Sequence, residues 1–587
     1  MATPPAAAPQ LMGARIKRRE DPALITGEGK YTGDIQLDHI ATMALLRSPY
    51  AHAEIRDIDT SAAKSIPGVI AVYTGEELNS RFAQPLPMVI PFDDAYSNAH
   101  NIPRLPLTTD KARHVGDPIV VVVAEDYYAA NDAVEAIQVS YKPLSAVIDP
   151  EQALGSDAAV LHDHMGTNLA FEWASSGGDV ENTFKSADKV VEIRLHNQRL
   201  IPSAMEPRAV TASYDANSDE LTIWTSTQIP HSIKEEVAPI LGIDQEKIRV
   251  IAPEVGGGFG AKSNLFSEEV LVPFLAKELG RPVKWVATRS EDYLATSHGR
   301  DQINILRLAA THDGKVTGAD LEVIADCGGY YSRVTPGIPP LTGMMMTGVY
   351  DIPNARCQAK GVLTNKGINE PYRGAGRPEA AFIVERGMDV LAAELEMDPS
   401  ELRRKNFIAP DKFPYTTATG ATYDSGEYAK AMDHALELID YSHLRQEQAK
   451  RRANGDKLLG IGLACYVEIC GFGPWEAGGV FMDQDAKVTV LSGTSPHGQG
   501  HQTAWAQLAA EALQIPLEDI TVKHGDTAVV PRGVGTFGSR SAPVGGSVVI
   551  KNADVVRDKG KEIAAHLLEA PVVDLVLDEG KFFVQGS

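Results

Sequence analysis

Residues 255–263 read Val-Gly-Gly-Gly-Phe-Gly-Ala-Lys-Ser. Four glycines in five positions leave few side chains between the backbone and an approaching group. Glycine also permits the positive φ angles that turn consecutive N–H groups toward one point. The apolar run Ile248–Ile251 precedes the loop, and apolar residues at helical spacing follow it from Leu265 to Leu279. The sequence therefore predicts a strand, a glycine loop and a helix N-terminus, which together suit an anionic group such as a phosphate.

A second stretch repeats the first. Residues 533–541 read Gly-Val-Gly-Thr-Phe-Gly-Ser-Arg-Ser, so Phe-Gly-Ala-Lys-Ser becomes Phe-Gly-Ser-Arg-Ser with the basic residue kept. Upstream, residues 241–243 and 248–250 match residues 513–515 and 520–522. We interpret the copies as two similarly built lobes that grip one elongated, anionic ligand; the alternative is a chance likeness of two strand–helix–strand units.

The composition is that of an ordinary globular protein. The length of 587 residues predicts about three or four domains. With a formal net charge of −23, the chain is not expected to bind nucleic acid or acidic membrane surfaces. No apolar run reaches the length of a membrane span, and we expect a cytoplasmic protein.

Cysteine and histidine spacing argues against a metal site made of side chains. The four cysteines, Cys327, Cys357, Cys465 and Cys470, contain no C-x₂-C pair. This predicts neither a disulfide framework nor a zinc or iron–sulfur site, and it favours a reducing compartment. His497 and His501 are four residues apart but have no third ligand beside them in the sequence.

The pattern of elements predicts an α+β protein. Residues 1–20 are expected to be a flexible lead that ends in a basic cluster, and residues 21–150 a compact α+β domain. A second region covers 160–410 and a third 428–587, with a loop rich in Pro, Thr, Gly and Tyr between them. The predicted elements include strands at 119–123, 460–469 and 487–491 and helices at 127–137, 379–395, 428–439, 501–513 and 547–568.

Two further stretches suit a polar ligand. Gln499 lies between two glycines at a helix start, where its amide can pair with a ring edge; the alternative is a tight turn with a polar N-cap. Arg373 and Arg377 lie on a glycine-broken loop before a helix, which suits a carboxylate, phosphate or oxo group. The alternative for this loop is salt bridging to Glu370 and Glu379.

Residues 256–261 also fit the dinucleotide fingerprint G-x-G-x-x-A. That fingerprint requires an acidic residue about 20 positions further on. Here the helix still runs at that point, and the next strand leads to the basic Arg289. A nicotinamide-dependent dehydrogenase is therefore an alternative with a weak basis.

Together these stretches resemble the molybdenum-binding large subunit of the xanthine dehydrogenase, aldehyde oxidase and carbon monoxide dehydrogenase family. Five motifs occur in the family's order: Ser226-Thr-Gln228, Gly-Gly-Gly258-Phe259-Gly260, Tyr372-Arg373-Gly374-Ala-Gly-Arg377, Gly498-Gln499-Gly500 and Thr536-Phe-Gly538-Ser539-Arg-Ser541. The resemblance runs over nearly the whole chain. It implies a hammerhead-like α/β domain followed by two related molybdopterin-binding α/β lobes, the second of them incomplete.

The resemblance also implies roles for single residues. Gln228 and Arg373 would be catalytic: Gln228 would hydrogen-bond an oxygen ligand of molybdenum, and Arg373 would stabilise negative charge near the substrate. No side chain would ligate the metal, which the pterin dithiolene would carry. The residues implied to bind the cofactor are Gly258, Phe259, Gly260, Gly374, Gln499, Gly500, His501, Thr503, Gly538, Ser539 and Ser541.

Two departures from the family pattern matter. Gly374 stands where the molybdenum–copper enzymes have a copper-binding cysteine, which implies a copper-free centre that hydroxylates carbon. The family's general base is a Glu in a Gly-Glu-Gly-like motif near the C-terminus of a longer chain, and this sequence ends before that point. Either the chain is a fragment, or another polypeptide supplies the base.

The resemblance further implies an assembly and a reaction. The large subunit would hold molybdopterin, as the cytosine dinucleotide, and oxidise an aldehyde or N-heterocycle with water as the oxygen source. Electrons would pass to a small 2Fe–2S subunit and a medium FAD subunit in a dimer of heterotrimers. The alternative is a cofactor-binding subunit that is inactive without a second polypeptide.

Overall fold

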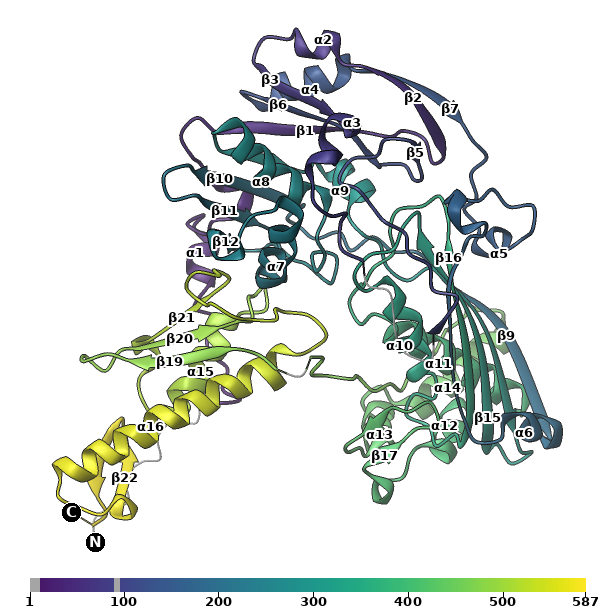
Figure 1. The fold of residues 1–587 in the computed structure, drawn as a ribbon. Helices are drawn as coiled ribbons and strands as arrows, with labels where there is room; N and C mark the ends of the chain where they lie inside the picture. Colours follow the sequence, from purple (N-terminus) through teal and green to yellow (C-terminus); the bar gives the residue numbers. More distant parts are fainter. Residues whose placement is uncertain (1–10, 89–95, 474, 587) are drawn as a thin grey trace.

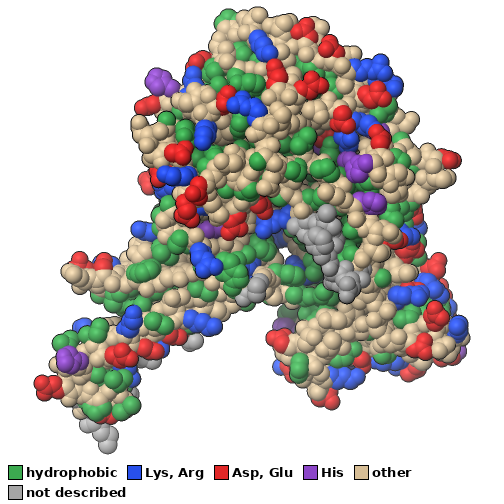
Figure 2. Space-filling view, viewed as in Figure 1, with side chains coloured by type: hydrophobic (Ala, Val, Ile, Leu, Met, Phe, Trp, Pro, Cys, Tyr) green, Lys and Arg blue, Asp and Glu red, His purple; other side chains and the backbone are tan. Residues whose placement is uncertain are grey.

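Three sheets organise the chain in the computed structural model, which describes residues 11–88, 96–473 and 475–586 (Figure 1). A seven-stranded sheet lies in the upper part of the view, a six-stranded sheet in the right arm and a three-stranded sheet in the left arm. The two arms stand apart in the space-filling view (Figure 2). Within the described residues, no helix has the length and apolar character needed to cross a membrane.

The seven-stranded sheet joins the N-terminal part of the chain to the region of the first glycine loop. Its strands are β1 (Ala41–Arg47), β3 (Val69–Thr74), β6 (Pro118–Ala124), β10 (Ala209–Asp215), β11 (Glu220–Thr225), β12 (Ile248–Ile251) and β13 (Val283–Val286). They lie in the order β12-β11-β10-β13-β1-β6-β3. The strand predicted at 119–123 is confirmed as β6, and every residue of β6 is buried. Because Ala41 of β1 pairs in parallel with Val283 of β13, the sheet crosses the boundary expected between residues 150 and 160.

Helices pack on this sheet from both parts of the chain. Helix α4 (Tyr127–Ala136) lies on β1 and β6, and its N-cap Asp126 accepts a hydrogen bond from the N–H of Ala129 at 2.9 Å. Helices α7 (Pro230–Leu241) and α8 (Ser267–Leu279) cover β10 to β13. A smaller sheet of β2 (Ala53–Asp59), β5 (Lys111–Ala112) and β7 (Gln138–Pro143) completes the N-terminal part.

The six-stranded sheet runs along the right arm (Figure 1). Its strands are β4 (Tyr96–Ser97), β8 (Leu169–Gly177), β9 (Lys189–Asn197), β14 (Gln302–Ala310), β15 (Val316–Gly328) and β16 (Asn354–Leu363), in the order β4-β8-β16-β15-β14-β9. The arm's helices include α6 (Val180–Ser186), α10 (Ile338–Met344), α11 (Arg377–Glu394), α12 (Pro399–Asn406), α13 (Tyr428–Leu438) and α14 (Tyr441–Asn454). Helices α10 and α11 pack on the sheet, and α11 and α13 confirm the helices predicted at 379–395 and 428–439.

The three-stranded sheet and two helices form the second lobe. Strands β19 (Gly478–Met482), β20 (Val488–Ser492) and β21 (Ile520–His524) pack against α15 (His501–Leu513) and α16 (Ser547–Leu567). The predicted helices at 501–513 and 547–568 are confirmed. Helix α16 runs past the sheet to a hairpin of β22 (Leu575–Asp578) and β23 (Lys581–Val584) at the tip of the arm (Figure 1).

The two lobes repeat one unit, as the sequence predicts. In the first lobe β11 pairs in parallel with β12, with Leu221 opposite Ile248; in the second β20 pairs in parallel with β21, with Val488 opposite Ile520. An antiparallel strand precedes each pair, a helix connects its strands, and a glycine loop and a helix follow. The lobes differ at one edge. Strand β10 also pairs with β13, whereas β19 has no second strand beside it within the described residues.

The strand predicted at 460–469 is wrong. Burial alternates along this stretch, but no neighbouring strand pairs with it in the described part of the chain. Side chains contact its backbone instead: Arg403 Nη2 donates to the carbonyl oxygen of Leu463 at 3.0 Å, and the N–H of Cys465 donates to Glu385 at 2.9 Å. Alternation identified an extended segment with one buried face, but it carries no information about a backbone partner.

Residues 11–20, expected as part of a flexible lead, lie against the second lobe. Glu20 is 7% exposed and accepts hydrogen bonds from both the backbone N–H and the hydroxyl of Thr503, 483 residues away. Residues 1–10 lie outside the described part of the chain. The lead therefore includes a docked segment, which we call the N-terminal segment 11–20.

Candidate functional site

The two glycine loops meet at Gln228. This residue follows β11 and is 1% exposed. Its Oε1 accepts from the N–H of Gly260 at 2.9 Å and from the N–H of Lys262 at 3.3 Å, while its Nε2 donates to the carbonyl oxygen of Thr536 at 2.8 Å. The N–H of Thr536 returns a bond to the carbonyl of Gln228 at 3.1 Å. Gln228 therefore ties the lobes together, and its role toward a metal oxygen ligand stays a prediction.

Glycine is required where the first loop meets residues 371–374. Gly260 has φ +101°, and a Cβ there would lie 2.3 Å from the carbonyl oxygen of Pro371. A Cβ on Gly258 would lie 2.5 Å from Gln228 Oε1. The N–H of Arg373 donates to the carbonyl of Phe259 at 2.8 Å, so the two backbones are in direct contact. Phe259 is 37% exposed beside this junction.

Arg373 is an exposed cation with no ion pair among the described residues. Its guanidinium lies 5.9 Å from the centre of the Phe259 ring. The alternative predicted from the sequence, salt bridging to Glu370 and Glu379, is wrong for this arginine. Glu370 accepts from Thr335 and its neighbours, and Glu379 faces Arg300. Arg373 is therefore free to act on a group outside the chain.

Neighbouring arginines hold the Arg373 loop in place. Arg300 donates to the carbonyl oxygens of Tyr372 and Arg373 at 2.6 and 2.8 Å. Arg377 is 7% exposed, and its Nε lies 3.2 Å from Glu468 Oε2. Arg377 therefore forms a salt bridge, as the alternative from the sequence proposed, but its partner is Glu468 instead of Glu370 or Glu379. Of the two arginines predicted from the sequence to bind an anion, Arg377 contacts Glu468 within the chain, whereas Arg373 can still contact a ligand.

The basic residue shared by the two loops braces each lobe internally. Lys262 Nζ contacts Glu206 at 2.9 Å, and Arg540 forms a buried ion pair with Glu476. Each carboxylate also accepts a backbone N–H of its own glycine loop, at 2.8 Å in the first lobe and 2.9 Å in the second. Burial lowers the pKa of Lys262. The repeat thus extends to an ion pair between a glutamate and a basic residue in each lobe. The two basic residues support the glycine loops from within the lobes.

The N-terminus of α15 offers an open row of donors. Within the described residues, the backbone N–H groups from Gly498 to Gln502 have no acceptor. A Cβ on Gly498 would meet nothing within 4 Å, and Gln499 is exposed, with its Oε1 accepting from the N–H of His497 at 2.6 Å. Unpaired N–H groups at the positive end of a helix favour an anion.

Buried polar atoms without partners lie at the start of α15 and in the second glycine loop. Ser495 Oγ, Thr536 Oγ1 and His501 Nδ1 have no hydrogen-bond partner in the described chain, and their residues are 1%, 4% and 4% exposed. Burial lowers the pKa of His501 to about 3, so its ring is neutral. Buried polar atoms are nearly always paired in native proteins. These residues therefore fit an elongated polar group with an anionic end.

Three further residues predicted to bind the cofactor, Thr503, Ser539 and Ser541, lie in the second lobe. Both donor groups of Thr503 are taken by Glu20, so Thr503 anchors the N-terminal segment 11–20. Ser539 is exposed, with its hydroxyl 3.0 Å from Glu468. Ser541 begins a π-helical turn, Ser541–Gly546, that leads into α16, and such turns are frequent at functional sites.

Two glycines among these residues are required by packing. A Cβ on Gly538 would lie 2.8 Å from Phe472 Cβ. Gly374 has φ +102°, and a Cβ there would lie 2.4 Å from Pro378 Cγ. Sequence reasoning missed Glu20, because no local pattern links it to a helix 483 residues away.

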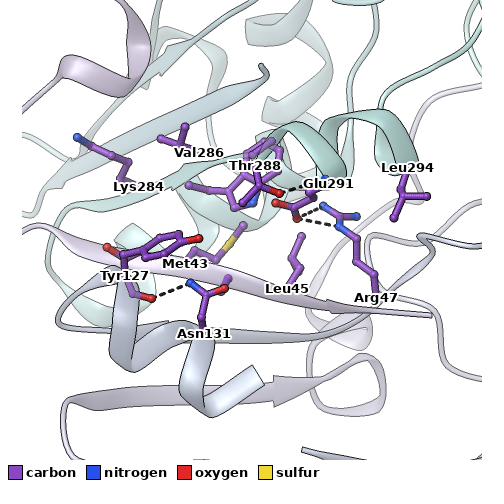
Figure 3. Close-up of a pocket in the computed structure, with 14 residues that line it drawn as sticks. Met43, Leu45, Arg47, Tyr127, Asn131, Lys284, Val286, Thr288, Glu291 and Leu294 are labelled. Carbon is purple, nitrogen blue, oxygen red and sulfur yellow. Dashed lines mark hydrogen bonds and ion pairs between the residues drawn. The ribbon is translucent and has the colours of Figure 1, made fainter. Parts of the chain in front are cut away.

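A separate groove of about 590 Å³ lies between β1, α4 and β13 (Figure 3). Met43, Leu45 and Tyr127 line it, and Arg47 and Glu291 form an ion pair at 2.8 Å at one end. None of the residues predicted from sequence to bind a ligand lies in its lining. The groove is therefore distinct from the junction of the glycine loops.

Comparison with protein families gives three matches. The profile described as "Aldehyde oxidase and xanthine dehydrogenase, a/b hammerhead domain" matches residues 26–145. Two profiles described as "Molybdopterin cofactor-binding domain" match residues 161–407 and 434–587.

Curated relatives and solved structures match nearly the full chain. It is 36% identical to the nicotine 6-hydroxylase large subunit of Paenarthrobacter nicotinovorans over 98% of the chain and 71% of that protein. It is 37% identical to the carbon monoxide dehydrogenase large chain of Hydrogenophaga pseudoflava over 98% and 74%. Quinoline 2-oxidoreductase from Pseudomonas putida 86 superposes with a TM-score of 0.92 at 33% identity, over 99% of this chain and 75% of that one.

Proposed function

Because the chain belongs to the aldehyde oxidase and xanthine dehydrogenase family, as the large subunit of a molybdenum hydroxylase, we propose that it oxidises an aldehyde or an N-heterocycle at carbon. Water is the oxygen donor in this proposal. The observation that carries it is the junction at Gln228, where a free Arg373 stands beside the first glycine loop. The unpaired N–H groups at the start of α15 lie in the second lobe, to which Gln228 is hydrogen-bonded through Thr536.

The chain's own residues would bind the cofactor and stabilise charge. Bound molybdopterin would supply the metal and its two-electron chemistry. Gly258, Phe259 and Gly260 would lie against it from the first lobe, and residues 498–502 would hold its phosphate end from the second. Arg373 would stabilise negative charge that develops on the substrate, because its guanidinium has no partner in the described chain to neutralise it.

The geometry at Gly374 favours carbon hydroxylation over carbon monoxide oxidation. In the molybdenum–copper enzymes that this chain resembles, a cysteine that binds copper follows the Tyr-Arg pair. Here a Cβ at that position would overlap Pro378, at 2.4 Å, and the backbone is left-handed, with φ +102°. A side chain there would displace the loop that carries Arg373. We therefore propose a centre without copper.

The partners follow from the same proposal. We propose that the cofactor is the cytosine dinucleotide and that a small 2Fe–2S subunit and a medium FAD subunit accept the electrons in the cytoplasm, in a dimer of heterotrimers. The chain's relatives include a carbon monoxide dehydrogenase large chain and a subunit of a dehydrogenase complex, which supports such an assembly.

Co-expression with candidate iron–sulfur and flavin subunits tests the proposal. The purified complex should contain molybdenum by mass spectrometry and release cytidine monophosphate on acid hydrolysis. It should reduce a dye with aldehydes or N-heterocycles and take up ¹⁸O from labelled water. A complex that contains copper and oxidises carbon monoxide, or one without molybdenum, would refute it. A complex that holds the cofactor but becomes active only after a further polypeptide is added would support the fragment alternative.

A further inference from the structure

The N-terminal segment 11–20 is fixed on the second lobe by contacts that span the sequence. Gln507 Nε2 donates to the carbonyl of Leu11 at 2.9 Å, and Leu11 packs against the core of this lobe. Arg19 donates to the hydroxyl of Thr503 at 2.8 Å through its N–H, and to the carbonyl of Ile520 at 2.7 Å through its guanidinium. Together with Glu20, these bonds hold the segment across the start of α15.

Arg18 faces the open end of that helix. A Cβ on Gly500 would lie 3.2 Å from Arg18 Nε and 3.7 Å from its Nη2, so glycine at this position leaves the guanidinium its space. The only ion pair of Arg18 among the described residues is with Asp21, at 3.4 Å, and it uses Nε. Neither Nη atom has an acceptor there. Burial raises the pKa of Glu20, but the hydrogen bonds from Thr503 and, to a smaller extent, the charge of Arg18 hold it below its usual value.

The position of Arg18 at the N-terminus of α15 indicates an anionic ligand. The N-terminus of a helix carries a partial positive charge, which favours a nearby anion and disfavours a nearby cation. Among the backbone N–H groups at the start of α15, Glu20 accepts only that of Thr503, and the N–H groups of residues 498–502 remain without acceptors in the described chain. The guanidinium of Arg18, with free donors, therefore lies beside Gly500, in the middle of the row of N–H groups that have no acceptor in the described chain. The shared chemistry is that of a phosphate.

We propose that Arg18 binds the phosphate end of the cofactor and that Glu20 positions it. The inference rests on the proposed function, because the phosphate belongs to the dinucleotide form of the pterin. Residues 498–502 would hold the group from the helix side and Arg18 from the segment side. The N-terminal segment 11–20 then forms one wall of the cofactor site, although the motif residues all lie more than 200 positions further along the chain.

Arg18→Ala and Arg15→Ala form a matched pair for the test. Both changes remove one exposed cation from the same segment, but Arg15 has no hydrogen bond or ion pair within the described residues. Each variant is made in the assembled complex. Molybdenum and acid-released cytidine monophosphate are counted per polypeptide, before and after timed incubation at raised temperature. A Glu20→Gln variant is measured alongside, with limited trypsin cleavage at Arg18 and Arg19 as a second readout.

The expected outcomes are distinct. Arg18→Ala should lose nucleotide about tenfold to 100-fold faster than the wild type, the range for one charge-assisted hydrogen bond. Arg15→Ala should match the wild type. Glu20→Gln should speed both nucleotide loss and tryptic cleavage. Arg18→Ala that retains nucleotide as well as the wild type would overturn the inference and leave Arg18 as a surface partner of Asp21. A wild-type complex without molybdenum or nucleotide would instead refute the proposed function.

Discussion

Replacing Arg373 by alanine should lower turnover and leave the fold intact. The side chain is exposed and makes no ion pair in the described chain, so its loss should change the free energy of unfolding by no more than about 0.5 kcal/mol. Its backbone N–H bond to Phe259 does not depend on the side chain. If the guanidinium stabilises developing charge, turnover should fall by ~10²-fold, or about 2.7 kcal/mol of activation free energy.

Arg377, the first residue of α11 directly after the same loop, is the matched control. It is buried, lies 3.2 Å from Glu468 and stacks on the ring of Phe472 at 4.9 Å. Because Glu468 is 35% exposed, solvent screens the pair, and Arg377→Ala should cost about 1–2 kcal/mol of stability. The two substitutions should therefore separate: one affects turnover, and the other affects unfolding.

The assay combines differential scanning calorimetry of each variant with initial rates on a panel of aldehydes and N-heterocycles. Molybdenum content is measured in the same preparations, so that rates are expressed per metal. Arg373→Lys should recover part of the rate, because a point charge lacks the planar fork of arginine. Unchanged turnover in Arg373→Ala at full metal content would refute the reasoning, as would a loss of stability that matches Arg377→Ala.

Other predictions follow from single contacts. Gly260→Ala should lose cofactor, because its Cβ would lie 2.3 Å from a carbonyl oxygen; metal analysis of the folded variant checks this. Arg540→Ala should lower the free energy of unfolding by about 3–5 kcal/mol, measured in urea, because it leaves Glu476 buried without its partner. Burial lowers the pKa of His524 from 6.5 to about 4, so the unfolded chain binds its proton first as the pH falls. Stability should therefore drop between pH 6.5 and 4, by at most ~1.4 kcal/mol per pH unit for this ring, and His524→Asn should flatten the pH profile. Cys470 is exposed and should react with a disulfide reagent before the other cysteines; equal rates for all four would contradict its placement.

The sequence predicts the repeated unit well, because its strands, helices and glycine loops follow from residue patterns that are local in the chain. Helix α15 begins at His501 and ends at Leu513, as its apolar spacing and the glycines before it indicate. The matched Phe-Gly-small-basic-Ser loops are confirmed in their element order and strand pairing. Five motifs in the family's order identified the family, which the comparisons then confirmed.

What the sequence does not predict lies in contacts between distant segments. Periodicity shows which face of a segment is buried but not which segment covers it, so residues 460–469 were expected to be a strand with a partner. The pairing of β1 with β13 and the contact of Glu20 with Thr503 join parts of the chain more than 200 positions apart. Likewise, a kept basic residue beside a glycine loop suggests a phosphate ligand, whereas the structure pairs Lys262 with Glu206 inside the lobe.

The open edge of β19 has a consequence for how the chain behaves when handled alone. Strand β10 pairs with β13 along its outer edge, whereas no strand pairs with the equivalent edge of β19 within the described residues, and Phe481 and Met482 of β19 are exposed. An unpaired, apolar strand edge is a template for cross-strand association between molecules. We therefore expect β19, a strand of five residues, to favour association between molecules of this chain in isolation, against the repulsion from a net charge of −23.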